Sequence, residues 1–383
     1  MADRLRLASI TLLRDEATII EAFHRHNIRF IDRMYVVDDG CRDTTLDIIA
    51  LLKEEGLDIV LIDQPRSGAF YLVHKMASAL ARILTDSEWD AIVPLDTDEF
   101  LVADSRAAFE RDIAGIPSGC VGGLSPIHYA LSDHDDPTIE SDLERIRHGL
   151  DTWPRVWKVI VPERVAKHEK AAFSEGNHAF LVDGVATPAH LLRTRLVHFR
   201  ARAPDELVAR SIAHYIRWRS REDYTEGTTE HRMRIVRAIA ESPSLAISEE
   251  FAGRIASRFL IGKEPEELVP VPFDATHAVT RFKHLATMKP YAIIVAAIDD
   301  LIADSRTTPP AGAEERAKEV LARLATARKE LAQAQAQLAA ARAELGELRG
   351  SNRRLLASAL ELIRRLRNSI AKRRARWAGR PPV

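Results

Sequence analysis

The sequence predicts an α/β protein in which a mostly parallel sheet is flanked by helices, followed by a helical region and a long C-terminal helix. Three observations support this class. Short apolar runs alternate with amphipathic segments over the first 130 residues, an order typical of βαβ units. An acidic cluster directly follows one apolar run, at 96–99. Near the C-terminus, leucine recurs at every seventh position.

The first part of the chain is predicted from its apolar runs and from the helical spacing of apolar side chains. Gly56 suits the end of the second helix. We expect strands at 5–13, 34–37, 59–62 and 91–95, and helices at 16–27, 44–55, 70–84 and 106–113.

The pattern loosens after residue 120. Extended segments are expected at 121–131, 157–161, 179–182 and 195–199, with a polar loop at 132–138 and a helix at 204–218. Pro204 suits the first turn of that helix. We expect the region from 233 to about 302 to be mostly helical, interrupted by its five prolines.

Composition changes divide the chain into five parts. Its 383 residues allow two or three domains, and proline and glycine cluster just after residue 307. We expect an α/β domain at 1–225, a helical extension at 226–306, a linker at 307–312, a coiled coil at 313–350, and a basic amphipathic helix with its tail at 351–383.

The C-terminal part differs from the rest in pattern and charge. Leucine occupies one seam of the seven-residue repeat and mostly alanine the other, which predicts a coiled coil or a tightly packed helical hairpin; a solvated single helix is the alternative. Residues 311–383 hold 17 basic and 7 acidic side chains, against 38 and 49 in the rest. The basic helix either lies on an anionic membrane surface or joins an oligomer.

Overall composition excludes several classes of protein. A hydrophobic fraction of 46% and a charged fraction of 29% are typical of a globular protein with a substantial core. We recognise no secretory signal and no membrane-spanning run. Two cysteines support neither a disulfide framework nor a thiolate metal site. We expect a cytoplasmic protein, with peripheral contact at the inner face of the membrane as the alternative location.

The acidic cluster is the strongest functional signal. Asp96 and Asp98 follow a run that reads as a buried parallel strand, so they fall where open α/β sheets bind ligands. In an extended segment the two side chains point to the same side. Two such oxygen ligands suit Mg²⁺ or Mn²⁺ bridged to the phosphates of a nucleotide diphosphate. The alternative is an acidic loop that caps the following helix.

Two earlier loops should reach the same edge of the sheet, at 13–16 and 37–44. In the second loop Gly40 permits a tight turn. We expect Asp39 to accept a hydrogen bond from a base or a ribose hydroxyl, whereas Asp43 is expected to cap the next helix.

Together these segments resemble the family 2 glycosyltransferases, in particular the bacterial branch whose acidic motif reads D-x-D-E-F. The resemblance is firm over about residues 5–105 and weaker to about 225. Two positions depart from the family pattern: Cys41 stands where serine is usual, and Asp15 where asparagine is common. The segments that carry the resemblance are Leu13-Arg14-Asp15-Glu16-Ala17, Val37-Asp38-Asp39-Gly40-Cys41-Arg42-Asp43-Thr44 and Asp96-Thr97-Asp98-Glu99-Phe100.

The resemblance implies a GT-A fold for residues 1–225, a nucleotide-sugar donor and transfer with inversion. It implies that Asp39 contacts the base and that Asp96 or Asp98 contacts the ribose and the metal-bridged diphosphate. The first loop would add Arg14 and Glu16 to the donor site. The metal would be Mn²⁺ or Mg²⁺.

Two histidines and one glutamate complete the predicted site. His198 lies where the resemblance places a late metal-ligating histidine, and a core histidine is the alternative. For the catalytic base, Glu175 and His178 belong to a segment that resembles a glycine-Asn-His element of this branch. The alternative base lies in the loop at 133–136, and His178 could equally be a strand-end histidine bonded to backbone.

The sequence therefore predicts a metal-dependent inverting glycosyltransferase of hexosyltransferase type, acting in surface glycan synthesis. Its expected partners are the nucleotide-sugar donor, a glycan, lipid or protein acceptor, and further copies of the chain through the coiled coil, with no nucleic acid. Two other functions are open: a nucleotidyltransferase, and a coiled-coil scaffold that carries a degenerate transferase domain.

Overall fold

The computed structural model describes most of the chain up to residue 307. The described residues are 4–62, 72–131, 135–136, 138–151, 157–221, 230–241, 254–255, 257–258, 267–271, 273–287 and 289–307. The coiled coil predicted at 313–350, the basic helix at 351–383, all but the first residue of the linker at 307–312, and most of the polar loop at 132–138 lie outside them.

A parallel sheet forms the first half of the fold, as the alternating pattern predicts. Its strands lie in the order β4-β1-β2-β3, and all their pairings are parallel. The α/β class is therefore confirmed. The strands are β1 (Leu7–Leu13), β2 (Arg33–Asp38), β3 (Ile59–Ile62) and β4 (Ala91–Pro94), and the helices between them are α1 (Ile20–Asn27), α2 (Thr45–Glu54) and α3 (Leu72–Asp86).

The sheet continues beyond β4 with mostly antiparallel pairings. β4 pairs with β8, β8 with β6, and β6 with β7, all antiparallel, whereas β12 runs parallel to β6 and antiparallel to β5. These strands are β5 (Glu99–Val102), β6 (Val121–Tyr129), β7 (His148–Asp151), β8 (Lys158–Pro162) and β12 (Ala189–Phe199). β12 lies between β5 and β6, and its pairing with β5 brings His198 beside Glu99 of the acidic motif.

Smaller elements surround this sheet. β7 passes so close to β6 that a Cβ atom built at Gly149 would lie 2.5 Å from the carbonyl oxygen of His128. A separate small sheet has the order β11-β10-β9. The remaining short elements are α4 (Arg106–Ala114), α5 (Asp142–Arg145), α6 (Glu163–Ala166), β9 (Ala171–Phe173), the 3₁₀ turn η1 (Glu175–Asn177), β10 (Phe180–Val182) and β11 (Val185–Ala186).

The expectation that 233–302 is mostly helical is wrong for its middle part. The helices α8 (Glu230–Glu241) and α10 (Pro290–Thr307) are present, but the described residues between 267 and 287 form turns and the short strand β13 (Val269–Pro270), which pairs with β7. Proline explains both outcomes. It interrupts a helix interior, and it is well placed at the first position of a helix such as α10.

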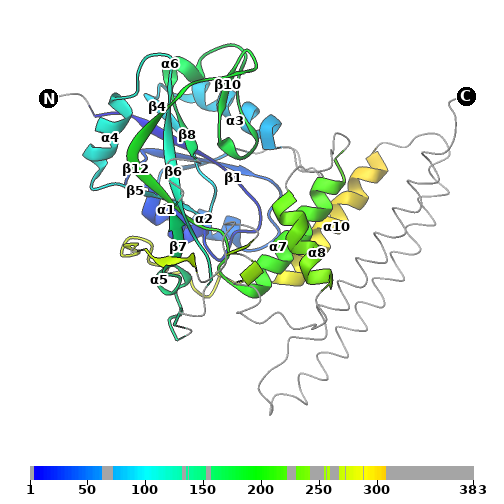
Figure 1. Cartoon of the computed structure of the whole chain (residues 1–383). Helices are drawn as coiled ribbons and strands as arrows, with labels where there is room; N and C mark the ends of the chain where they lie inside the picture. The colour runs from blue at the N-terminus through cyan, green and yellow to red at the C-terminus, as the bar shows by residue number, and fades with distance from the viewer. Residues whose placement is uncertain are drawn as a thin grey trace, which may run out of the picture.

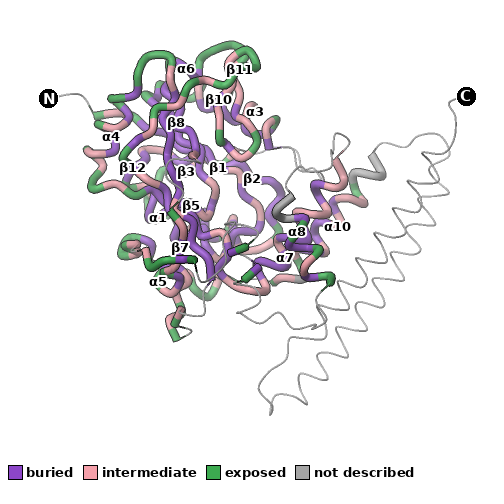
Figure 2. Tube along the Cα trace, viewed as in Figure 1, coloured by how far each residue is buried: buried purple, intermediate pink, exposed green. Residues whose placement is uncertain are grey.

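The two faces of the parallel sheet are covered by different helices. Alternate residues of β1 and β2 point to opposite faces, so Leu7 and Val36 join one core cluster while Ile10 and Tyr35 join the other. α1, α2 and α7 (Pro204–Arg219) contribute to the first cluster, and α3 to the second. Figure 2 shows the buried strands between these layers and the exposed β11.

The late helices α7, α8 and α10 pack as one group beside the sheet (Figure 1). α10 contacts α7, and its Asp300 reaches the loops after β1 and β2. Asp300 therefore contacts Arg14 and Arg42 at the carboxyl edge of the parallel sheet, although it lies far from them in the sequence. In the described part of the chain, no helix combines the length and apolar composition needed to cross a membrane.

Candidate active site

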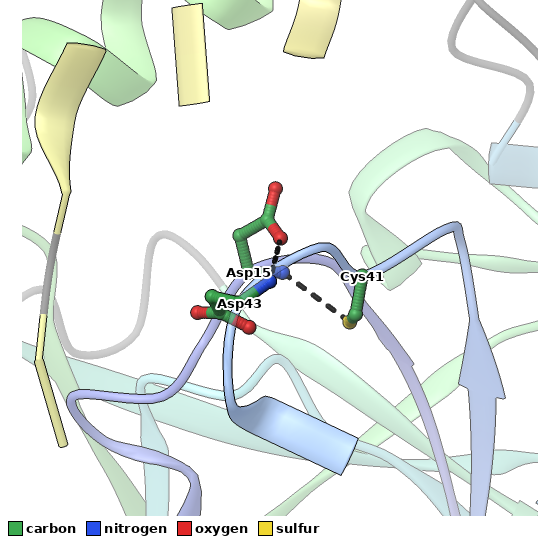
Figure 3. A group of neighbouring side chains, drawn as sticks. All are labelled: Asp15, Cys41 and Asp43. Atoms are coloured by element: carbon green, nitrogen blue, oxygen red, sulfur yellow. Dashed lines mark hydrogen bonds between the residues drawn. The ribbon is translucent and has the colours of Figure 1, made fainter. Parts of the chain in front are cut away.

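The loops after β1 and β2 meet at the carboxyl edge of the parallel sheet, where open α/β sheets bind ligands. The Asp15 carboxylate accepts hydrogen bonds from the backbone N–H groups of Arg42 (2.7 Å) and Asp43 (3.2 Å). Its own backbone N–H donates to Cys41 Sγ at 3.3 Å (Figure 3). Asp15 adopts a left-handed φ of 54°, a conformation that aspartate tolerates better than most residues. These bonds fix the loops against each other.

Asp43 lies one residue before Thr44, the N-cap residue of α2, and binds the first residue of the helix in place of the predicted cap. Its carboxylate accepts hydrogen bonds from the Thr45 N–H at 2.9 Å and from the Ala17 N–H at 3.1 Å. Asp15, Cys41 and Asp43 present ligand atoms within 4.8 Å of one another, so a metal there is sterically conceivable. Backbone amides already occupy the carboxylates, however, and burial together with Asp38 raises the pKa of Cys41, which keeps the thiol protonated. The trio therefore serves to join the loops.

Asp39 lies in a buried cluster of cations. It is 2% exposed, and its carboxylate pairs with Lys75 of α3 and Arg217 of α7. Arg14 approaches to 3.9 Å. Arg14 in turn pairs with Asp300 of α10. The structure thus brings the predicted donor-binding residues Arg14 and Asp39 together and surrounds them with side chains from three helices.

Glu16 is directed toward α7. Its carboxylate accepts two hydrogen bonds from Arg210, at 2.6 and 2.8 Å, and its backbone N–H donates to Thr45 Oγ1 at 2.7 Å. Burial raises the pKa of Glu16 despite the attraction of Arg210. The sequence places Glu16 in the donor loop, and its contacts with Arg210 join that loop to α7.

The acidic motif forms a turn between β4 and β5. The Glu99 carboxylate accepts a hydrogen bond from the Asp96 N–H at 2.9 Å, and the Glu99 N–H donates to the Asp96 carbonyl at 3.0 Å. The expectation that Asp96 and Asp98 share one side of an extended segment is therefore wrong. Because Glu99 closes the turn, the two aspartates contact different partners.

Asp98 lies against His198, and Asp96 lies against Lys158. The distance from Asp98 Oδ1 to His198 Nε2 is 3.1 Å, and His198 Nδ1 lies 3.5 Å from Glu99 Oε1. Lys158 Nζ lies 2.5 Å from Asp96 Oδ2 and 3.1 Å from Glu99 Oε1. Asp98 and His198 are thus together, as predicted, whereas a lysine that the sequence analysis missed holds Asp96.

The charges of this cluster stabilise one another. Burial opposes ionisation of Asp98, but the nearby His198 outweighs it and holds the Asp98 pKa well below its usual range. Burial also opposes the charge on Lys158, yet Asp96 and Glu99 raise its pKa overall. An ionised aspartate beside an imidazole is a suitable donor set for a divalent cation.

The predicted catalytic residues lie on and next to η1. Glu175 is exposed and pairs with Arg221 at 3.1 Å. His178 Nδ1 lies 2.9 Å from the Trp157 carbonyl oxygen, a backbone contact of the kind expected in the alternative interpretation. Partial desolvation by the surrounding chain and the positive charge of Lys158 lower the pKa of His178. His178 is therefore influenced by Asp96 of the acidic motif, whereas Glu175 pairs with Arg221.

Lys158 and His128 were not predicted as site residues. Lys158 stands at the start of an apolar run, where a buried lysine without a partner would be costly; that anomaly is a usable signal. His128 gives no comparable signal, because its relation to His198 depends on the pairing of β6 with β12.

No protein-family model and no curated protein matches the sequence. Solved structures do show similarity. A mannosyltransferase from Pyrobaculum calidifontis in complex with GDP-Man and Mn²⁺ is 14% identical, with 85% of this chain and 81% of that chain covered at a TM-score of 0.35. S. aureus TarS 1–349 in complex with UDP is 13% identical, with 62% and 73% covered at 0.32.

A third similar structure is GalNAc-T7 with UDP, GalNAc and Mn²⁺, at 12% identity, 52% and 44% coverage and a TM-score of 0.31. At these identities and TM-scores, the function of the present chain has to be argued from its own residues.

Proposed function

We propose that this protein is a metal-dependent glycosyltransferase that moves a sugar from a nucleotide-diphosphate donor to a hydroxyl acceptor with inversion. The observation that carries the proposal is the 3.1 Å contact between Asp98, in the turn that follows the parallel strand β4, and His198 of β12. Asp39 and Arg14 come from the neighbouring loops of the same edge. This arrangement supports the function that the sequence resemblance implies.

The carboxylates of the turn and the adjacent His198 of β12 are ligand types that suit a divalent cation. Asp98 is kept ionised, His198 offers an imidazole, and the Asp96 side chain is 43% exposed, so a phosphate-bound ion can reach it. These three residues would hold Mn²⁺ or Mg²⁺. Bound there, the ion would stabilise the nucleotide diphosphate as it leaves.

The donor would lie over the loops after β1 and β2. Asp39 would accept a hydrogen bond from the base, with Arg14 beside it. Asp39 is engaged by Lys75 and Arg217 in the structure, so donor binding would exchange part of that ion pairing for contacts with the nucleotide. Glu16 would act by holding the loop on α7.

The acceptor hydroxyl would attack the anomeric carbon as the bond from that carbon to the diphosphate oxygen breaks. A base must take the hydroxyl proton. We assign this role to the segment that contains Glu175 and His178, with His178 favoured because Lys158 and Asp96 of the acidic cluster act on its ring. We also propose that the transferred sugar is a hexose and that the acceptor is a glycan, a lipid or a protein. The reaction would then belong to surface glycan synthesis.

The decisive test substitutes Asp98 by asparagine, which keeps the shape of the side chain and removes its charge. We expect Asp98→Asn to lower donor turnover with Mn²⁺ at least a hundredfold, the scale on which removal of one electrostatic group at a reacting centre acts. We also expect it to abolish the thermal shift that Mn²⁺ and a nucleotide-sugar panel give the wild type.

Asp104→Asn is the matched control, because Asp104 is exposed and lies six residues along the chain. It should retain full turnover. Turnover that survives both a chelator and Asp98→Asn would refute the metal-dependent mechanism. If the wild type binds no nucleotide sugar, a scaffold that carries a degenerate transferase domain would explain the protein better than a glycosyltransferase.

A further inference from the structure

The segment that contains Glu175 and His178 is a closed loop between two paired strands. It joins β9 to β10, which pair antiparallel in the small sheet. The Ser174 N–H donates a hydrogen bond to the Ala179 carbonyl at 2.9 Å, and the Ala179 N–H donates to Ser174 Oγ, also at 2.9 Å. Because these two bonds join the ends of the loop, the residues between them are held in a defined conformation.

A backbone carbonyl group orients the ring of His178. The Nδ1 atom of His178 lies 2.9 Å from the carbonyl oxygen of Trp157. A carbonyl oxygen can only accept a hydrogen bond, so Nδ1 carries the proton of the neutral ring, and the free lone pair belongs to Nε2. Trp157 directly precedes Lys158, whose ammonium group pairs with Asp96. The residue that orients the ring is therefore adjacent in sequence to the residue that holds the acidic turn.

The Nε2 atom is accessible to a second molecule. His178 is exposed, and its Nε2 makes no hydrogen bond with the described residues. A hydroxyl group can therefore approach this nitrogen from solvent. The ring thus has one nitrogen fixed to the backbone and the other available to accept a proton.

Gly176 provides the space that this ring orientation requires. Its backbone is left-handed, with a φ of +69°, and a Cβ atom built there would lie 2.9 Å from His178 Cδ2 and 3.0 Å from His178 Nε2. Because the ring belongs to an exposed side chain, the ring is the part that would yield. A side chain at position 176 would therefore push the imidazole away from the Trp157 carbonyl.

We propose that Nε2 of His178 is the atom that takes the acceptor proton and that Gly176 is a positioning residue for it. This inference rests on the proposed function, because it concerns the base of the same transfer. As the acceptor oxygen bonds to the anomeric carbon, its proton passes to Nε2, and the electron pair of the broken donor bond leaves with the diphosphate. The imidazolium still donates from Nδ1 to Trp157, so the ring keeps its orientation during the transfer.

The first measurement determines the tautomer and requires no donor. Proton–nitrogen correlation NMR of the full chain with isotope-labelled histidine, in mildly alkaline buffer, shows which ring nitrogen carries the proton. His178→Gln removes the His178 signals and so assigns them among the 14 histidines. We expect a protonated Nδ1 and a bare Nε2. A proton on Nε2, or an even mixture of the two forms, would overturn the proposal.

Gly176→Ala tests the positioning role, and Gly184→Ala is the matched control. Gly184 also has a left-handed backbone, with a φ of +79°, but a Cβ atom there would have no neighbour within 4 Å. Both variants therefore introduce similar backbone strain, and only Gly176→Ala displaces the ring. We expect Gly176→Ala to lower kcat about tenfold to a hundredfold, the scale on which misplacement of a reacting group acts, with KM for the donor unchanged.

The control should keep both kcat and the His178 signals of the wild type, whereas Gly176→Ala should change both. Equal kcat in the two variants, or equal His178 signals, would contradict the positioning role. Should Gly176→Ala fail to fold, Gly176→Asn takes its place, because asparagine tolerates a left-handed backbone better and still carries a Cβ atom.

The outcomes separate this inference from the proposed function. A wild type that transfers sugar with Mn²⁺ but protonates His178 on Nε2 would overturn the inference alone. Full turnover in His178→Gln would have the same effect and would leave the metal-dependent transferase standing. A wild type that turns over no nucleotide sugar would overturn both.

Discussion

Lys158 shows how a single residue neutralises the acidic turn. Its ammonium group lies between Asp96 and Glu99, and Glu99 is fully buried. A metal ion near this turn would share the neutralising role with the lysine. Under the proposed function, the metal ion would be a second, exchangeable cation beside this fixed one.

We expect Lys158→Met to destabilise the protein and to make it more responsive to metal. Removing one partner of a buried pair leaves the other charge uncompensated, at a cost of about 3 kcal/mol, reduced here because Asp96 is partly exposed. Melting curves in EDTA should fall by several degrees, and Mn²⁺ should restore more of the loss than it adds to the wild type.

Lys167→Met provides the control, because Lys167 is exposed and pairs with Glu163 at 2.6 Å on the surface. It should melt within about a degree of the wild type, as surface pairs contribute little. Equal melting of Lys158→Met and wild type in EDTA would contradict the stabilising role assigned to Lys158.

At the scale of elements, α10 acts on the loops of the parallel sheet. Asp300 lies near its middle and pairs with both Arg14 and Arg42, one from each loop. Packing of α10 against α7 places this carboxylate. α10, near the end of the described part of the chain, thus orients Arg14 and Arg42 near its beginning.

We expect Asp300→Asn to weaken donor binding more than it slows the chemical step. The asparagine keeps the shape but loses the charge that orients Arg14 beside Asp39, so KM for the donor should rise several-fold while kcat changes little. The free energy of unfolding should fall by about 1–3 kcal/mol, since two arginines lose a buried partner.

Asp299→Asn is the neighbouring control. Asp299 lies 3.6 Å from Arg42 and is more exposed than Asp300, so it should have the smaller effect on both quantities. A kcat that falls in Asp300→Asn with KM unchanged would show that α10 acts on catalysis by another route.

At the scale of the whole molecule, stability should decline as the pH falls below 6.5. Burial lowers the pKa of His24 to about 3 and that of His26 to about 4. An unfolded chain has ordinary histidines with pKa values near 6.5. Between these limits the unfolded state binds more protons, so each group removes up to about 1.4 kcal/mol of stability per pH unit, and nothing above pH 6.5.

Urea unfolding at pH 7, 6, 5 and 4.5 measures this loss. We expect His24→Phe, which keeps an aromatic ring against Phe23, to have a shallower decline than the wild type. His168→Gln, at an exposed position, should leave the slope unchanged. An identical slope in the His24 variant would contradict the assignment.

The sequence was sufficient for the features that depend on local pattern. The parallel strands β1 to β4 and the helices between them follow from apolar periodicity, and the edge with Asp39 and Asp98 follows from strand order. The second half of the sheet was harder, because β12 pairs with β5 and β6 across long stretches of chain. No local signal could place His128 beside His198 or Asp300 beside Arg14.

The close approach of β7 to β6 also carries an evolutionary consequence. Any side chain at position 149 would press on the backbone of His128, displacing the imidazole relative to its neighbour on β12. Position 149 therefore accommodates no side chain unless β7 moves away from β6, although it bears no chemical group of its own. Among divergent descendants of this gene, glycine should therefore persist at 149 wherever β7 stays paired with β6.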